Sequence, residues 1–127
     1  MPTISEAEAQ VMEVLWAADA PLSTEDIASA LQGRQDWQLA TIKTLLNRLL
    51  NKGAVAADKD GRRYLYTPRL SREDWAGEQA TGLLDRLFGG SLAPLVAQFG
   101  SQRKLRPDEV EALRQLLQDY DKAEKKK

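Results

Sequence analysis

The sequence predicts a mainly α-helical protein of the α+β class with one small β-hairpin. The isoleucine and leucines of segment 40–52 recur at helical spacing, the pattern of an amphipathic helix docked on a core. Asp60-Gly61 separates two short β-prone segments, and this dipeptide is a strong signal for a two-residue hairpin turn. Residues 71–127 contain further apolar stretches at helical spacing, which predict a second, helical region.

Composition excludes several classes of protein. The 127 residues suffice for one domain, or for two small ones that share an interface. The absence of cysteine and histidine excludes disulfides, thiolate and imidazole metal sites, and catalysis by either side chain. No apolar run approaches the roughly 20 residues of a membrane span, and no signal peptide opens the chain. We expect a cytoplasmic protein without a metal, a cofactor, a membrane partner or enzymatic activity.

The charges are sorted along the chain, although the net charge is only −1. Residues 1–40 hold seven acids and one base, whereas residues 41–69 hold seven bases and two acids. A local basic block is the feature that favours contact with phosphate, whatever the total charge. The bases of this block are Lys43, Arg48, Lys52, Lys59, Arg62, Arg63 and Arg69.

Two capped helices are predicted before segment 40–52. Ser5 and Glu8 form a capping box for a helix that ends near residue 18. Ser23 and Asp26 repeat the signal for a helix over 24–31. The next helix has no good cap, so the sequence leaves its start open over several residues. A helix, a tight turn and a second helix with a polar outer face predict a helix-turn-helix.

The outer face of the helix at 40–52 is polar and free of acids. Such a face suits a DNA major groove, because phosphates repel carboxylates and base edges are read by hydrogen bonds. A merely solvated helix surface is the alternative, and the helix alone does not decide between them. The candidate contacts are Thr41, Lys43, Thr44, Asn47 and Arg48.

The hairpin after this helix is also basic. Its predicted strands are 55–59 and 62–67, and either its tyrosine face or its leucine face can be buried. Arginines on an exposed turn usually serve solubility, but a cluster beside a cationic helix favours contact with phosphate. A basic hairpin in this position is typical of a wing, with Lys59, Arg62 and Arg63 as candidate DNA contacts.

The predicted domains are a winged-helix DNA-binding domain over 1–70 and a three-helix dimerisation domain over 71–127. Three wide apolar faces in fewer than about 60 residues cannot all be buried within that region. A second copy is the commonest partner, and a symmetric dimer reads two half-sites about 10 base pairs, or a multiple of that, apart. The candidate dimerisation residues are Trp75, Leu83, Leu84, Leu87, Phe88, Val110, Leu113, Leu116, Leu117 and Tyr120.

The segment TIKTLLNRL at 41–49, followed by Lys52-Gly53 and Tyr64-Leu65-Tyr66, resembles the penicillinase-repressor family. These are winged-helix repressors of beta-lactam resistance and their copper-responsive relatives. The likeness continues through 87–99 to the last helix and covers nearly the whole chain. It implies a homodimer on a palindromic double-stranded DNA operator, with Arg62 and Arg63 facing the DNA backbone.

The resemblance also implies a mode of release. In the beta-lactam branch, the signal of a membrane sensor leads to cleavage of the dimerisation domain before a phenylalanine, usually after asparagine. The matching bond here is Gln98–Phe99, which implies a sensor-linked protease as a partner. The copper branch relies on C-terminal cysteines, and this chain has none. The sequence therefore resembles the beta-lactam branch more than the copper branch.

Our first hypothesis is a dimeric, sequence-specific transcriptional repressor. We expect Lys43 and Arg48 to provide most of the affinity, and Thr44 and Asn47 to contribute specificity. The alternative is a module that docks a protein partner with the same winged helix. That alternative predicts exposed apolar residues on the outer helix face, and none of the five candidate contacts there is apolar.

Overall fold

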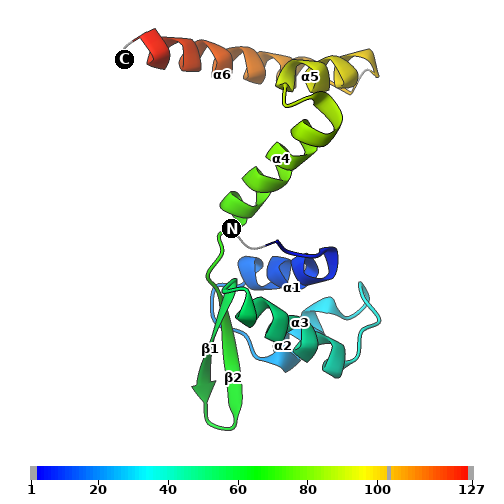
Figure 1. Cartoon of the computed structure of the whole chain (residues 1–127), viewed down its shortest axis with the longest axis vertical. Coiled ribbons are helices and arrows are strands. Elements are labelled where there is room, and N and C mark those ends of the chain that lie inside the picture. The colour runs from blue at the N-terminus through cyan, green and yellow to red at the C-terminus, as the bar shows by residue number, and fades with distance from the viewer. Residues whose placement is uncertain (1–2, 103, 126–127) are drawn as a thin grey trace. The chain divides into compact units, whose positions relative to one another are not determined.

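The computed structural model describes residues 3–102 and 104–125. The chain divides into two compact units, Met1–Glu78 and Gln79–Lys127. Figure 1 labels the elements, whose order along the chain is α1 (Glu6–Ala17), α2 (Thr24–Leu31), α3 (Leu39–Asn51), β1 (Val55–Asp60), β2 (Arg63–Pro68), α4 (Arg72–Phe88), α5 (Leu92–Ser101) and α6 (Pro107–Lys125).

Reciprocal capping boxes start α1 and α2, as predicted. The backbone N–H of Glu8 donates to the Ser5 hydroxyl, and the Glu8 carboxylate accepts from the Ser5 N–H. Ser23 and Asp26 make the same two hydrogen bonds at the start of α2. Each box satisfies N–H groups that have no partner inside the helix, which fixes where the chain turns helical.

α3 begins at Leu39, and the side chain of its N-cap residue, Gln38, makes no capping hydrogen bond. The predicted weak start is therefore confirmed. The helix ends at Asn51, and Gly53 follows with a φ of 75°, a conformation that glycine adopts at little cost.

The core of the N-terminal unit lies between α1, α2, α3 and the base of the hairpin. The apolar stripe of α3 is buried, with Leu46 and Leu49 fully inaccessible. Tyr66 is only 8% exposed, so the tyrosine side of β2 faces the core near the base of the hairpin. Figure 1 shows α1, α2 and α3 gathered beside the hairpin, whose tip extends beyond the helices. The core thereby fixes the position of the outer face of α3 next to the hairpin.

The hairpin turn lies one residue later than the sequence predicted. β1 and β2 pair antiparallel, with Asp60 opposite Arg63, so the two loop residues are Gly61 and Arg62 rather than Asp60 and Gly61. Gly61 has a φ of 66° and takes the first central position of the turn. The prediction was wrong because the dipeptide signal identifies a turn, whereas strand pairing sets its register.

The first turn of α4 packs on α1 within the N-terminal unit. The rings of Trp75 and Trp16 have centroids 5.4 Å apart. The Trp16 indole N–H donates to the Leu70 carbonyl at 2.8 Å, and Arg72 pairs with Glu13 at 3.1 Å. These contacts join the start of α4 to the N-terminal unit, which extends to Glu78. The functional division into residues 1–70 and 71–127 stays a prediction.

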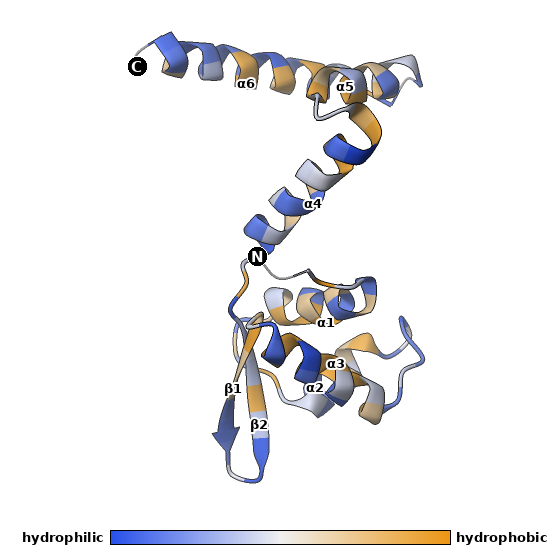
Figure 2. Ribbon diagram, in the orientation of Figure 1, coloured by the Kyte–Doolittle hydropathy of each residue, from blue (hydrophilic) through white to orange (hydrophobic). Residues whose placement is uncertain are grey.

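In the C-terminal unit, α5 and α6 carry most of their apolar side chains on the outside. No described residue of α4, α5 or α6 is buried. Figure 2 shows apolar residues recurring along these helices among polar ones. Leu87, Leu116, Leu117 and Tyr120 are each at least 64% exposed. Across the described part of the chain, no helix is both long enough and apolar enough to span a membrane.

Candidate nucleic-acid interface

The outer face of α3 is exposed as the sequence predicted. Ile42, Leu45, Leu46 and Leu49 are buried, and this burial turns the opposite face of the helix to solvent. All five predicted contacts are exposed: Thr41, Lys43, Thr44, Asn47 and Arg48.

A groove joins this face to the hairpin. Lys43 and Asn47 lie one helical turn apart on α3 and line the groove together with Arg62 and Arg63 of the hairpin. The structure thus brings together four of the predicted DNA contacts from two separate elements. Thr41, Thr44, Arg48 and Lys59 are exposed but do not line the groove.

Four further residues of the groove were missed by sequence reasoning, and one of them is the buried Tyr66. Thr24 and Glu25 contribute the first turn of α2, and Tyr64 contributes an aromatic ring from β2 that is 51% exposed. The signal for Tyr64 is the alternation of the strand, which places it on the same face as Tyr66, and both tyrosines line the groove. Nothing in the sequence places the start of α2 beside the hairpin.

Two acids, Asp60 and Asp26, interact with one of the wing arginines, Arg63. Arg63 lies 3.5 Å from the Asp60 carboxylate across the turn, with both side chains mostly in water. Hydrogen bonds from Ser23 lower the pKa of Asp26, and the positive charge of Arg63 adds to this effect. Exposed pairs of this kind are weak, typically below about 1 kcal/mol, so a phosphate can compete for the arginine.

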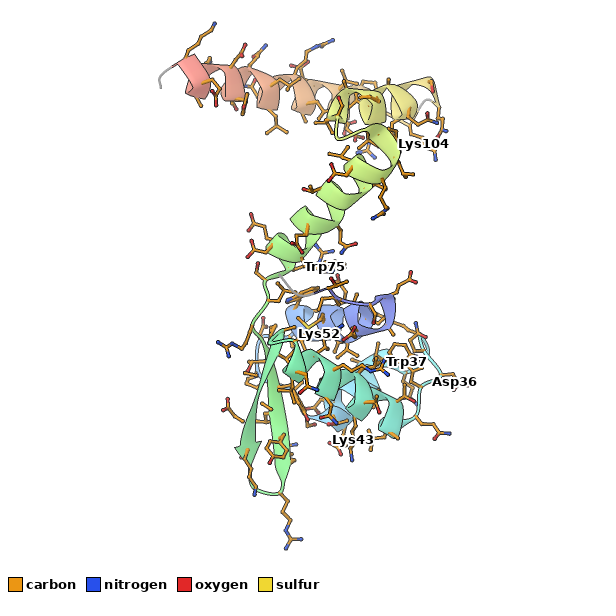
Figure 3. The ribbon with its side chains drawn as sticks, in the orientation of Figure 1. Asp36, Trp37, Lys43, Lys52, Trp75 and Lys104 are labelled. Atoms are coloured by element: carbon orange, nitrogen blue, oxygen red, sulfur yellow. The ribbon has the colours of Figure 1, made fainter. Side chains whose placement is uncertain are left out.

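Lys52 belongs to the basic block of the sequence but not to the basic surface. Its ammonium lies 2.6 Å from Glu8 and donates to the Thr3 carbonyl at 2.7 Å. In Figure 3 Lys52 lies next to α1, whereas Lys43 projects from α3 on the side away from α1. Lys52 therefore anchors the C-terminal end of α3 to α1.

The Thr44 hydroxyl has a partner within α3. It donates to the Ala40 carbonyl at 3.0 Å, a common bond for threonine inside a helix. Its proton is thus engaged, and in this rotamer its oxygen remains available as an acceptor. Among the described residues, no cluster of three or more acids is placed to hold a metal ion.

A three-helix unit whose third helix presents a polar, cationic face beside a basic hairpin defines a winged-helix domain. The family model described as penicillinase repressor matches residues 4–119. The chain belongs to this family.

Two relatives and one solved structure illustrate the similarity. The penicillinase repressor of Bacillus licheniformis is 32% identical over 120 residues, which cover 94% of this chain and 93% of that protein. The methicillin resistance regulatory protein MecI of Staphylococcus aureus strain N315 is 31% identical, covering 90% and 92%.

A solution structure of monomeric Bacillus licheniformis BlaI in complex with the blaP half-operator is 38% identical. It covers 57% of this chain and 88% of that one, with a TM-score of 0.50. The two relatives that cover 90% or more of this chain are named a repressor and a regulatory protein, and neither name is that of an enzyme.

Proposed function

We propose that the protein is a homodimeric, sequence-specific repressor that binds a palindromic operator in double-stranded DNA. The observation that carries this proposal is the groove in which Lys43 and Asn47 of α3 meet Arg62 and Arg63 of the wing. Cations from two elements gathered on one side of a domain are the electrostatic footprint of a nucleic-acid-binding protein. The similarity to a repressor solved on a half-operator supports the same conclusion. We place such a protein in the cytoplasm, with the DNA.

The polar face of α3 enters the major groove in this proposal. Lys43 and Arg48 bind phosphates or the acceptor edges of guanine, and Asn47 is suited to adenine. Thr44 presents its hydroxyl oxygen as an acceptor, because its O–H donates a hydrogen bond to the Ala40 carbonyl. Arg62, Arg63 and Lys59 of the wing contact the sugar–phosphate backbone, which fixes the register without reading sequence.

The exposed apolar side chains of the C-terminal unit support dimerisation through that unit. Leu87, Leu116, Leu117 and Tyr120 are at least 64% exposed, and burying them against a second copy removes apolar area from water. Five further residues extend the same proposed surface. Leu83 is 37% exposed. The other four are partly buried: Leu84, Phe88, Val110 and Leu113. Trp75 already packs on Trp16, so its part in the dimer is secondary to its part in the N-terminal unit.

A DNA-binding titration on the promoter region next to the protein's own gene tests this function. We expect one retarded complex at moderate salt, and affinity that falls steeply as salt is raised, because cations release condensed counterions. The variant carrying Lys43→Ala and Arg48→Ala loses binding. The matched control, Arg69→Ala with Lys122→Ala, removes the same amount of charge elsewhere and should still bind the DNA. Salt-independent binding, or full binding by the first variant, contradicts the proposal.

A protein-docking module is the second candidate, because Leu39 at the start of α3 is 39% exposed. The same titration separates the two functions, since a docking module binds promoter and unrelated DNA equally weakly.

We also propose that cleavage at Gln98–Phe99 inactivates the repressor. This bond lies inside α5, and the Gln98 carbonyl accepts from the Ser101 hydroxyl at 3.0 Å and from the Gln102 N–H at 3.3 Å. The end of α5 must therefore open before a protease can hold the bond extended. Mass spectrometry of the protein from cells exposed to a beta-lactam should show a fragment that ends at Gln98. An intact chain in induced cells contradicts cleavage but not repression.

A further inference from the structure

Two large apolar side chains are exposed among the described residues of the N-terminal unit. They are Leu39, at 39%, and Tyr64, at 51%. Tyr64 lines the groove between α3 and the wing, and Leu39 is the first residue of α3. Both lie on the two elements that form the proposed DNA interface.

Leu39 has no structural role that accounts for its exposed side chain. It does not belong to the hydrophobic core, nor to the half-buried residues packed against that core. Its position places it one turn before Lys43 and two turns before Asn47, so it heads the row of α3 that faces the groove.

We propose that Leu39 reads the 5-methyl group of a thymine in the operator. This inference rests on the proposed function. The N-terminal residues of the second helix of a helix-turn-helix contact base edges. The thymine methyl is the one apolar group that the base pairs present in the major groove, and it is read by contact with an apolar group of the protein. An apolar side chain at the head of a polar, cationic row therefore matches a thymine next to hydrogen-bonded bases.

The chemical group itself can be removed from the DNA. Deoxyuridine differs from thymidine only by the missing methyl, so each thymine of one half-site is replaced in turn and the dissociation constant is measured. For the wild-type protein we expect one replacement to weaken binding about fourfold, the equivalent of one buried methyl group. For Leu39→Ala, the same replacement changes nothing, because the contact is already absent.

Tyr64→Ala is the matched control. It removes the other exposed apolar side chain of the unit and should remain as sensitive to deoxyuridine as the wild type. Alanine is the best helix former, so Leu39→Ala should keep the helical circular dichroism and melting temperature of the wild type.

The outcomes separate the inference from the function on which it rests. In one outcome the wild type binds specifically, and the binding free energies lost through deoxyuridine and through Leu39→Ala add at every position. This outcome overturns the role of Leu39 and leaves the proposed repressor function standing. Specific binding that is unaffected by any deoxyuridine overturns it too. Absence of specific binding by the wild type overturns both, whereas coupling at one position alone establishes the thymine contact.

Discussion

The Lys52 ammonium lies 2.6 Å from the Glu8 carboxylate and joins the C-terminal end of α3 to the first turn of α1. Glu8 is 1% exposed, and the oxygen that meets Lys52 also accepts the Ser5 N–H at 2.9 Å. A carboxylate buried to this degree is stable only when it is paired. This ion pair thus adds to the buried leucines in fixing the C-terminal end of the helix that presents the proposed DNA contacts.

Removing one partner of this pair should cost more than removing both. Glu8→Gln or Lys52→Met should each lower the free energy of unfolding by roughly 2 kcal/mol, less than for a fully buried pair because Lys52 keeps 34% of its side chain exposed. Urea titration measures the loss. The double variant Glu8→Leu with Lys52→Met should recover part of it, whereas equal and additive losses would show that the pair is not coupled.

The same carboxylate should make stability depend on pH. Burial raises the pKa of Glu8, but hydrogen bonds from Lys52 and Ser5 and the charge of Lys52 together lower it below its ordinary value. A lowered pKa means that the folded state binds its proton less readily than the unfolded state. The stability is therefore complete above the ordinary glutamate pKa and is lost as the pH falls through the lowered one.

Urea titrations at a series of acidic pH values check this direction. Glu8→Gln should show a flatter fall in unfolding free energy than the wild type. The pKa of Asp26 is also lowered, so Asp26 likewise makes the unfolding free energy fall at acidic pH. It is present in both proteins, so some pH dependence remains in Glu8→Gln. Identical slopes for the two proteins would exclude Glu8 as a source of the pH dependence.

Trp75 should stabilise the N-terminal unit more than it stabilises a dimer. Its ring lies 5.4 Å from that of Trp16, so Trp75→Ala should lower the unfolding free energy by roughly 2 kcal/mol, below the cost for a fully buried tryptophan. Leu87→Ala is the control, because Leu87 is 66% exposed. We expect Leu87→Ala to weaken self-association in sedimentation equilibrium and to leave the stability of the N-terminal unit unchanged. If Trp75→Ala instead weakened self-association and left the unfolding free energy unchanged, Trp75 would belong to the dimer interface.

Neutralising Glu25 should tighten DNA binding. Its carboxylate lines the groove with Lys43 and Arg62 and repels phosphate there. Glu25→Gln should raise affinity about threefold at low salt, the scale of one exposed charge interaction, and the gain should shrink as salt is added. Glu78→Gln, on α4, makes the same change of charge outside the groove and should have no effect. Equal effects of the two variants would mean that only net charge matters.

Gly61 should be required for the wing. Its φ of 66° is strained for any residue with a Cβ, although a Cβ there would meet no atom within 4 Å. Gly61→Ala should therefore cost about 1–2 kcal/mol through backbone conformation alone, seen as faster amide exchange across β1 and β2. Gly77→Ala is the control, since Gly77 has equal space but lies inside α4 without a positive φ. Unchanged exchange in Gly61→Ala would contradict the assigned turn.

The helices could be predicted from the sequence because their signals are local. Ser5 with Glu8, and Ser23 with Asp26, form the predicted capping boxes, since each box needs only groups three residues apart. The hairpin was predicted but its register was not. The Tyr66 N–H donates to the Leu22 carbonyl at 2.7 Å, and the Leu22 N–H donates to the Tyr66 carbonyl at 3.1 Å. This contact joins residues far apart in the sequence, so no turn signal contains it.

The sequence by itself determined that a polar, acid-free helix face is followed by a basic hairpin, because side-chain periodicity and turn chemistry act over a few residues. Only the tertiary structure decided which cations share a surface. Lys52 forms an ion pair with Glu8. Arg62 and Arg63 line the same groove as Lys43 and Asn47. The physical reason is that the sequence gives the order of the charges along the chain. Ion pairing and burial depend instead on distances between elements, and only packing sets those distances.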